Sequence, residues 1–132
     1  MQYLYPAVFH EEDGKILVEV PDLPGIYTFG DDLNEAFLMA QDAIEMWLWD
    51  AENKSEPIPP PSALNDVPRE VSGSFVSLVH ADTDDYRRKF ERRAIKKTLS
   101  IPAWLNYRAE QANAPFSQIL QQGLKEYLNI AA

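Results

Sequence analysis

Short segments near the start of the chain have the residue pattern of strands. Residues 3–9 (YLYPAVF), 15–20 (KILVEV) and 26–29 are rich in aromatic and β-branched residues, which favours extended structure. The Asp-Gly pair at 13–14 predicts a tight hairpin between the first two. Pro6 has no N–H to donate, so we expect the first strand to be a sheet edge, or to bulge, at that position.

A long amphipathic segment follows these strands. Apolar residues recur at helical spacing over residues 32–53, which predicts a helix with one face on the sheet. Asp32 and Glu35 have the spacing of a capping box at its start. Prolines in residues 57–61 cannot continue the helix, and residues 74–80 (SFVSLVH) predict a fourth strand after a long loop. The order strand–strand–strand–helix–strand predicts an α+β domain.

The other side of this helix also carries apolar side chains, namely Leu38, Met46 and Trp49. Two interpretations are open. These side chains could pack under the proline-rich loop, or they could form a patch that binds a partner protein.

The last part of the chain has a different pattern. Residues 94–101 alternate between apolar and polar, which predicts a strand, and helices are predicted at 102–112 and 115–129. Residues 83–90 are expected to form a short connecting helix or a partly ordered linker. The predicted organisation is a domain at 1–81, a linker at 82–93 and a second domain at 94–132.

One strand and two helices cannot bury a sufficient core, and a lone strand needs a partner. Two copies solve both problems, because their strands can pair antiparallel over the four helices. The predicted dimer core consists of Ile95, Leu99, Ile101, Ile119, Leu120 and Leu124. Such a dimer is a ribbon-helix-helix domain, and its paired strands have the right width for a DNA major groove.

Charge divides the chain in the same way. The formal net charge is −9, but residues 1–85 carry 18 acidic and three basic side chains, whereas residues 86–132 carry three acidic and nine basic ones. The acidic part repels nucleic acid and suits a basic partner, while the basic part attracts nucleic acid or an acidic protein.

Candidate chemistry is sparse. The chain has no cysteine, which excludes disulfides and thiolate metal sites and mildly favours a cytoplasmic location. No apolar run is long enough to span a membrane. His10 and His80 are far apart in sequence, and acidic residues near the turns are more typical of solvated loops than of a two-metal nuclease site. We therefore expect no catalytic residues, no metal and no cofactor.

Residues 18–62 carry a specific series of motifs: PDLPG, then TFG before an acidic helix start, then an EA-containing helix with tryptophans, then IPPPS. This series closely resembles the HicB antitoxin family. The resemblance implies a degenerate ribonuclease-H-like domain that is not an enzyme and that binds and blocks HicA, a small basic mRNA-cleaving ribonuclease. The candidate toxin-binding residues are Glu11, Glu12, Asp13, Asp22, Asp31 and Trp49.

The segment KKTLSIPAWLNYRAEQANAPFSQILQQGLKEYL resembles the ribbon-helix-helix ending of some HicB antitoxins. The resemblance implies that the outward strand positions read DNA bases and that Ser117, at the start of the second helix, holds a phosphate. Thr98 and Ser100 are short, so affinity is expected to rest on the nearby cations. The candidate DNA-binding residues are Lys96, Thr98, Ser100, Lys97, Arg92, Arg93 and Ser117.

The expected function is therefore that of an antitoxin that also autoregulates its operon by binding operator DNA as a homodimer, with a dimer of dimers left open. One alternative is a one-component ribbon-helix-helix repressor whose N-terminal domain senses a ligand or another protein. Another is an active ribonuclease-H-like nuclease.

Overall fold

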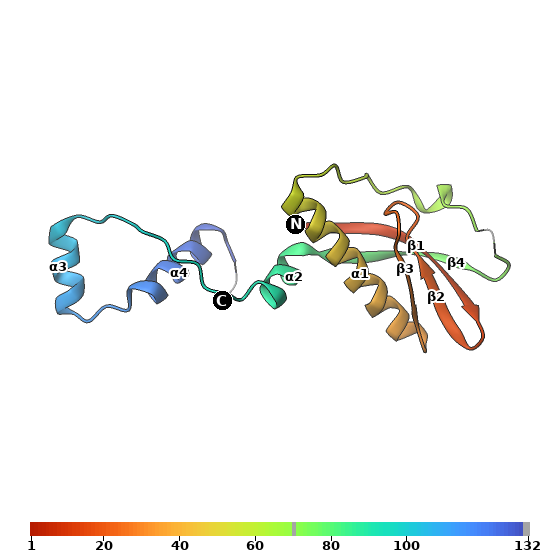
Figure 1. The fold of residues 1–132 in the computed structure, drawn as a ribbon, viewed down its shortest axis with the longest axis horizontal. Coiled ribbons are helices and arrows are strands. Elements are labelled where there is room, and N and C mark those ends of the chain that lie inside the picture. The colour runs from red at the N-terminus through yellow and green to blue at the C-terminus, as the bar shows by residue number, and fades with distance from the viewer. Residues whose placement is uncertain (70, 131–132) are drawn as a thin grey trace. The chain divides into compact units, whose positions relative to one another are not determined.

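The computed structural model describes residues 1–69 and 71–130, which belong to two compact units, Met1–Arg93 (unit 1) and Ala94–Ala132 (unit 2) (Figure 1). Unit 1 contains β1 (Gln2–Glu12), β2 (Lys15–Glu19), β3 (Tyr27–Gly30), α1 (Leu33–Lys54), the short 3-10 helix η1 (Leu64–Asp66), β4 (Phe75–Asp82) and α2 (Thr83–Phe90). Unit 2 contains α3 (Ala103–Gln111) and α4 (Phe116–Tyr127).

The four strands of unit 1 form one antiparallel sheet in the order β3-β2-β1-β4. The order of strands and helix along residues 2–82 is the one that the sequence predicts, and unit 1 is a mixed α+β structure. The β1–β2 hairpin closes with Glu12 opposite Lys15, so the connecting loop has two residues. Asp13 and Gly14 have φ angles of 52° and 78°, as a type I′ turn requires. The predicted hairpin is confirmed.

The expectation for Pro6 is only partly met. β1 is an inner strand of the sheet rather than an edge strand. However, its pairing with β2 starts at Val8, whereas its pairing with β4 includes Pro6 opposite Leu78. At Pro6 the strand therefore has a neighbour on one side only, and a missing N–H is tolerated there.

Helix α1 lies across one face of the sheet and closes the core (Figure 1). The Asp32 carboxylate accepts a hydrogen bond from the Glu35 N–H at 2.7 Å, which confirms the predicted helix start. Gly30 must lack a side chain, because a Cβ there would lie 2.3 Å from the Ala36 backbone nitrogen. The core residues are Tyr5, Ala7, Phe9, Val18, Val20, Leu23, Ile26, Ala36, Ala40, Ile44, Leu48, Val79 and Ala81.

The expected linker, for which a short connecting helix or a partly ordered segment was predicted, begins with helix α2, and this helix packs against α1 inside unit 1. Thr83 is completely buried and Tyr86 is 8% exposed. The Tyr86 ring lies against Trp49 of α1, with ring centroids 5.5 Å apart. The sequence shows the helix but not this packing, which depends on residues more than 30 positions away.

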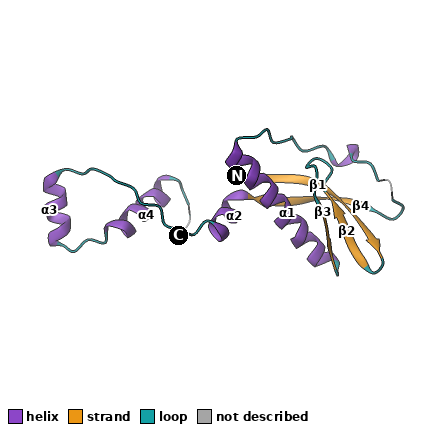
Figure 2. Cartoon of the chain, viewed as in Figure 1, coloured by secondary structure: helices purple, strands orange, loops and turns teal. Residues whose placement is uncertain are grey.

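Unit 2 has helices close to the predicted positions, but residues 91–102 form no strand (Figure 2). A strand needs a neighbour to accept and donate its backbone hydrogen bonds, and a single copy offers none within residues 94–130. The described large apolar residues of unit 2 are all exposed, from Ile130 at 36% to Tyr127 at 84%. They include the side chains that line an open groove of about 600 Å³, among them Leu99, Ile101 and Ile119.

Candidate functional site

An acidic cluster forms at the tip of the β1–β2 hairpin. Glu11, Glu12 and Asp13 are all exposed there. Asp31 reaches the same region through an ion pair with Lys15, whose Nζ lies 2.8 Å from the Asp31 carboxylate. This hydrogen bond and the charge of Asp31 raise the pKa of Lys15. Four of the six candidate toxin-binding residues therefore gather at one end of the sheet.

An aromatic surface lies next to this tip, on the face of the sheet that α1 does not cover. Tyr27 is 74% exposed and Phe29 is 47% exposed. Together with His10, Leu17 and Glu19 they line a shallow pocket of about 260 Å³. Sequence reasoning missed this surface, although Tyr27 and Phe29 stand two residues apart in a predicted strand and therefore had to share a face.

Asp22 has a structural contact instead of lying free on the surface. Its two carboxylate oxygens accept hydrogen bonds from the Ser62 backbone N–H at 2.8 Å and from the Ser62 hydroxyl at 2.6 Å. The contact joins the PDLPG turn to the end of the proline-rich loop. These two motifs are thus bound to each other, and Asp22 is set apart from the acidic tip.

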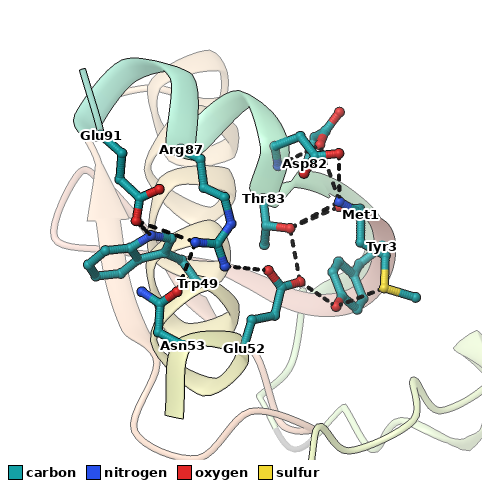
Figure 3. Close-up of polar contacts among 10 residues, drawn as sticks. Met1, Tyr3, Trp49, Glu52, Asn53, Asp82, Thr83, Arg87 and Glu91 are labelled. Atoms are coloured by element: carbon teal, nitrogen blue, oxygen red, sulfur yellow. Dashed lines mark hydrogen bonds and ion pairs between the residues drawn. The ribbon is translucent and has the colours of Figure 1, made fainter. Parts of the chain in front are cut away.

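Trp49 is also engaged within unit 1. Besides its contact with Tyr86, its indole N–H donates to the Glu91 carboxylate at 3.0 Å (Figure 3). Packing under the proline-rich loop is therefore the wrong interpretation for Trp49. Its neighbours are Tyr86 of α2 and Glu91, the residue that follows α2. Leu38 and Met46, which were grouped with it, are 58% and 52% exposed.

The contact between α1 and α2 centres on one carboxylate, that of Glu52 (Figure 3). It accepts hydrogen bonds from the Tyr3 hydroxyl at 2.7 Å, the Thr83 hydroxyl at 2.9 Å and the Arg87 guanidinium at 3.0 Å. Arg87 also donates to the Asn53 side-chain oxygen at 2.8 Å. One carboxylate thus joins β1, α1 and α2.

The titration of these groups reflects the same geometry. Burial tends to raise the pKa of Glu52, but the hydrogen bonds from Tyr3, Arg87 and Thr83 outweigh it and hold the pKa below the ordinary value. Burial, followed by the hydrogen bond to Glu52, raises the pKa of Tyr3 to about 12. The ion pair with Glu52 raises the pKa of Arg87. The charged form of Glu52 is therefore the form that stabilises unit 1.

The candidate DNA-binding residues lie along residues 92–100 and at the start of α4. All seven are exposed: Lys96, Thr98, Ser100, Lys97, Arg92, Arg93 and Ser117. Lys97 and Ser117 both line the apolar groove of unit 2. Residues 94–101 form no strand in a single copy, so their side chains have no defined faces there. The assignment of Lys96, Thr98 and Ser100 to one outward face stays a prediction.

The two histidines of the chain lie in unit 1 and contact side chains at its surface. His10 Nε2 lies 3.4 Å from Glu12, and His80 Nε2 lies 3.3 Å from the Gln2 amide oxygen, so each histidine contacts a surface side chain. Residues 1–69 and 71–130 contain no cluster of three or more His, Cys, Asp or Glu side chains that could hold a metal ion. Among these residues, no helix has the length and apolar character to cross a membrane.

Unit 1 is an α+β unit with more acidic than basic side chains, and unit 2 is helical with more basic than acidic ones. Residues 5–123 match the family model described as HicB_like antitoxin of bacterial toxin-antitoxin system. The chain belongs to this HicB-like antitoxin family.

Three individual proteins are also similar to this chain. The chain is 29% identical over 110 residues to an uncharacterized 14.9 kDa protein of Haemophilus phage HP1, covering 82% of this chain and 80% of that protein. It resembles a chain of a toxin–antitoxin complex from Streptococcus pneumoniae, with 25% identity, a TM-score of 0.63 and coverage of 96% and 99%. It also resembles the antitoxin HicB of Burkholderia pseudomallei, with 22% identity, a TM-score of 0.55 and coverage of 96% of both chains.

Proposed function

We propose that this chain is an antitoxin that binds and neutralises a HicA-type mRNA-cleaving ribonuclease and also represses its own operon by binding operator DNA. The observation that carries the proposal is the family match over residues 5–123, which includes most of unit 1 and most of unit 2. Both proposed partners are cytoplasmic, and we propose the same location for this chain.

Toxin binding is assigned to unit 1, whose sheet has the element order expected of a degenerate ribonuclease-H-like domain. The acidic tip formed by Glu11, Glu12 and Asp13 favours a basic partner, because opposite charges speed the encounter of two proteins. The resemblance implies that HicA is such a partner. Inhibition then needs no catalytic group on this chain, since covering the nuclease surface is sufficient.

DNA binding is assigned to a homodimer of unit 2. The exposed apolar residues supply a surface that a second copy can bury, and a two-fold pair of strands at residues 94–101 would present Lys96, Thr98 and Ser100 together. The chain then binds operator DNA through two half-sites, since the ribbon has two-fold symmetry. Pairing of dimers into a dimer of dimers is compatible with this arrangement.

Co-expression tests the proposal. A candidate HicA-type reading frame, sought beside the gene of this chain, is induced in bacteria with and without the chain, while a reporter follows the operon promoter. The proposal predicts that the reading frame alone arrests growth, that the chain restores growth, and that the chain lowers reporter output. Repression without any effect on growth would favour a one-component repressor. Degradation of RNA by the purified chain with Mg²⁺ or Mn²⁺ would favour an active nuclease.

A further inference from the structure

The face of the β2–β3 sheet that points away from α1 has the properties of a protein-docking surface. Strand pairing places His10 beside Leu17, Leu17 beside Phe29, and Glu19 beside Tyr27. Since residues alternate between the two faces of a strand, all five side chains lie opposite the core residues Phe9 and Val18. They line the pocket of about 260 Å³ described above.

The exposed rings on this face are unusual for a strand pair in a folded unit. Tyr27 is 74% exposed and Phe29 is 47% exposed, and they stand on the same face two positions apart. Scattered apolar side chains on a surface are common, whereas exposed apolar side chains gathered around a depression are a candidate interaction site. Tyrosine is also among the residues that contribute most to binding at protein interfaces.

Each of these rings has a polar or charged neighbour within unit 1. Lys15 Nζ lies 4.9 Å from the centre of the Phe29 ring and is itself paired with Asp31. The Tyr27 hydroxyl lies 3.4 Å from the Glu19 carboxylate. Both rings are on a strand rather than on a loop, so the backbone that carries them is already ordered when a partner covers them.

The rim of this face selects the charge of the partner. Glu12 and Glu19 point to the same side of the sheet, and Glu11 and Asp13 stand at the hairpin tip next to it. Lys15 also lies here, but its charge is already balanced by Asp31. The rim is therefore net acidic, and it complements a basic protein surface.

The edge of the sheet beside the pocket is open. β3 is an edge strand, so one side of its backbone has no neighbouring strand. At the opposite edge, the Gln41 side chain donates to the His80 carbonyl of β4 at 2.9 Å and occupies part of that edge. A partner that covers Tyr27 and Phe29 can thus hydrogen-bond to the open backbone edge of β3. At the β4 edge, the His80 carbonyl already accepts from Gln41.

Phe90, another exposed aromatic residue of unit 1, fits a basic partner less well. Phe90 is 63% exposed and stacks on Tyr86, but it lies on α2 next to Arg88 and Lys89. These cations repel a basic surface at the point where the ring would have to be buried.

We propose that the basic face of the HicA-type toxin docks on the outer face of β2–β3, with Tyr27 and Phe29 as the buried anchors and the acidic hairpin tip as the steering rim. This inference rests on the proposed function and adds the place of contact. It also removes Trp49 and Asp22 from the contact surface, since both side chains are used inside unit 1.

The test compares two exposed aromatic residues of unit 1 in the full-length chain. The probe is the candidate HicA-type toxin, in a form whose ribonuclease activity has been removed by substitution. Tyr27→Ala is expected to weaken binding about thirtyfold, whereas Tyr27→Phe, which keeps the ring, and Phe90→Ala are expected to change it by less than about threefold. Calorimetric titration gives the affinities, and thermal unfolding confirms that each variant is folded.

The outcomes separate the inference from the proposed function. If the unchanged chain does not bind the probe, the proposed function fails and the inference fails with it. If the unchanged chain and Tyr27→Ala bind equally well, the proposed function stands and the inference is overturned. A larger loss with Phe90→Ala than with Tyr27→Ala would also overturn it, and would place the contact on α2.

Discussion

The two units differ in what a single copy of the chain can bury. In unit 1, α1 and the sheet enclose Ala7, Phe9 and Ile44 with no exposure to solvent. In unit 2, every large apolar residue between positions 94 and 130 is at least 36% exposed. A single copy of unit 1 thus buries its own hydrophobic core. Unit 2 has enough apolar residues for a core, but residues 94–130 of a single copy do not bury them.

This difference indicates which functions depend on assembly. Burial of apolar surface is the main source of folding free energy, and a unit that leaves this surface in water gains little from it. A second copy of unit 2 would supply the missing cover. We therefore expect DNA binding to depend on chain concentration, and toxin binding by unit 1 to be independent of it.

The largest expected effect comes from a charge in the groove of unit 2. Leu99→Asp should abolish dimerisation and operator binding together, because an unpaired carboxylate in the shared core costs several kcal/mol, on the order of 3–5. Light scattering measures the mass, and a polarisation titration measures DNA binding. Gln122→Asp, which changes a polar side chain on the far side of α4, should leave the mass unchanged. A Leu99→Asp chain that stays dimeric through residues 94–132 would refute the prediction that Leu99 belongs to the dimer core of unit 2.

The second prediction concerns the boundary of unit 1. A chain that ends at residue 93 should fold as stably as unit 1 does in the full chain. A chain that ends at residue 81 lacks the buried Thr83 and Tyr86 and should lose about 3 kcal/mol of unfolding free energy. Urea unfolding of the two fragments gives the difference. Equal midpoints would show that α2 is a linker after all.

The third prediction examines the polar contact between α1 and α2. Arg87→Ala should lower the free energy of unfolding by about 1–2 kcal/mol, because Glu52 loses a charged donor in a partly buried site. Arg88→Ala removes the same charge from an exposed position of the same helix and should cost less than about 0.5 kcal/mol. Urea unfolding at pH 7 compares them, and equal losses would contradict the role of Glu52.

The fourth prediction separates base contacts from phosphate contacts among the candidate DNA-binding residues. Lys96→Ala should weaken operator binding about tenfold and relax sequence preference, because Lys96 is predicted to face the bases. Arg92→Ala should weaken binding equally on all sequences and lower the slope of log affinity against log salt by about one unit for each half-site. Titrations over a salt series distinguish the two. A uniform loss with Lys96→Ala would place that side chain on the phosphates.

The smallest expected effect is a pH dependence. The pKa of Glu52 is lower in the folded unit than its ordinary value of 4.5. Its stabilising effect is therefore complete above pH 4.5 and is lost as the pH falls through the lower, folded value. The stability advantage of the unchanged chain over Glu52→Gln should shrink on acidification below pH 4.5, as urea unfolding at several pH values would show. A constant difference would mean that the charge of Glu52 does not matter.

The sequence predicts the parts of the fold that local chemistry decides. The Asp13-Gly14 turn and the Asp32 cap each depend on residues within a few positions of one another, and both are found where expected. The packing of α2 could not be predicted, because the Arg87–Glu52 and Tyr86–Trp49 contacts join residues more than 30 positions apart.

The contacts of the candidate site residues could not be predicted for the same reason. Charge singles out Glu11, Glu12 and Asp13 as candidates, but it could not show that Asp22 is bound to Ser62 or that Asp31 is paired with Lys15. The aromatic surface of Tyr27 and Phe29 appears only when the strand register is known, because the register decides which side α1 leaves uncovered.

Hydrogen exchange at residues 95–101 tests most directly the claim that unit 2 is completed by a second copy. These residues form no strand within one copy, so their amide hydrogens should exchange quickly in a dilute sample. At concentrations where the chain is dimeric, alternate amides should become protected as the two strands pair. Fast exchange at these residues in a chain that is dimeric by light scattering would contradict the account.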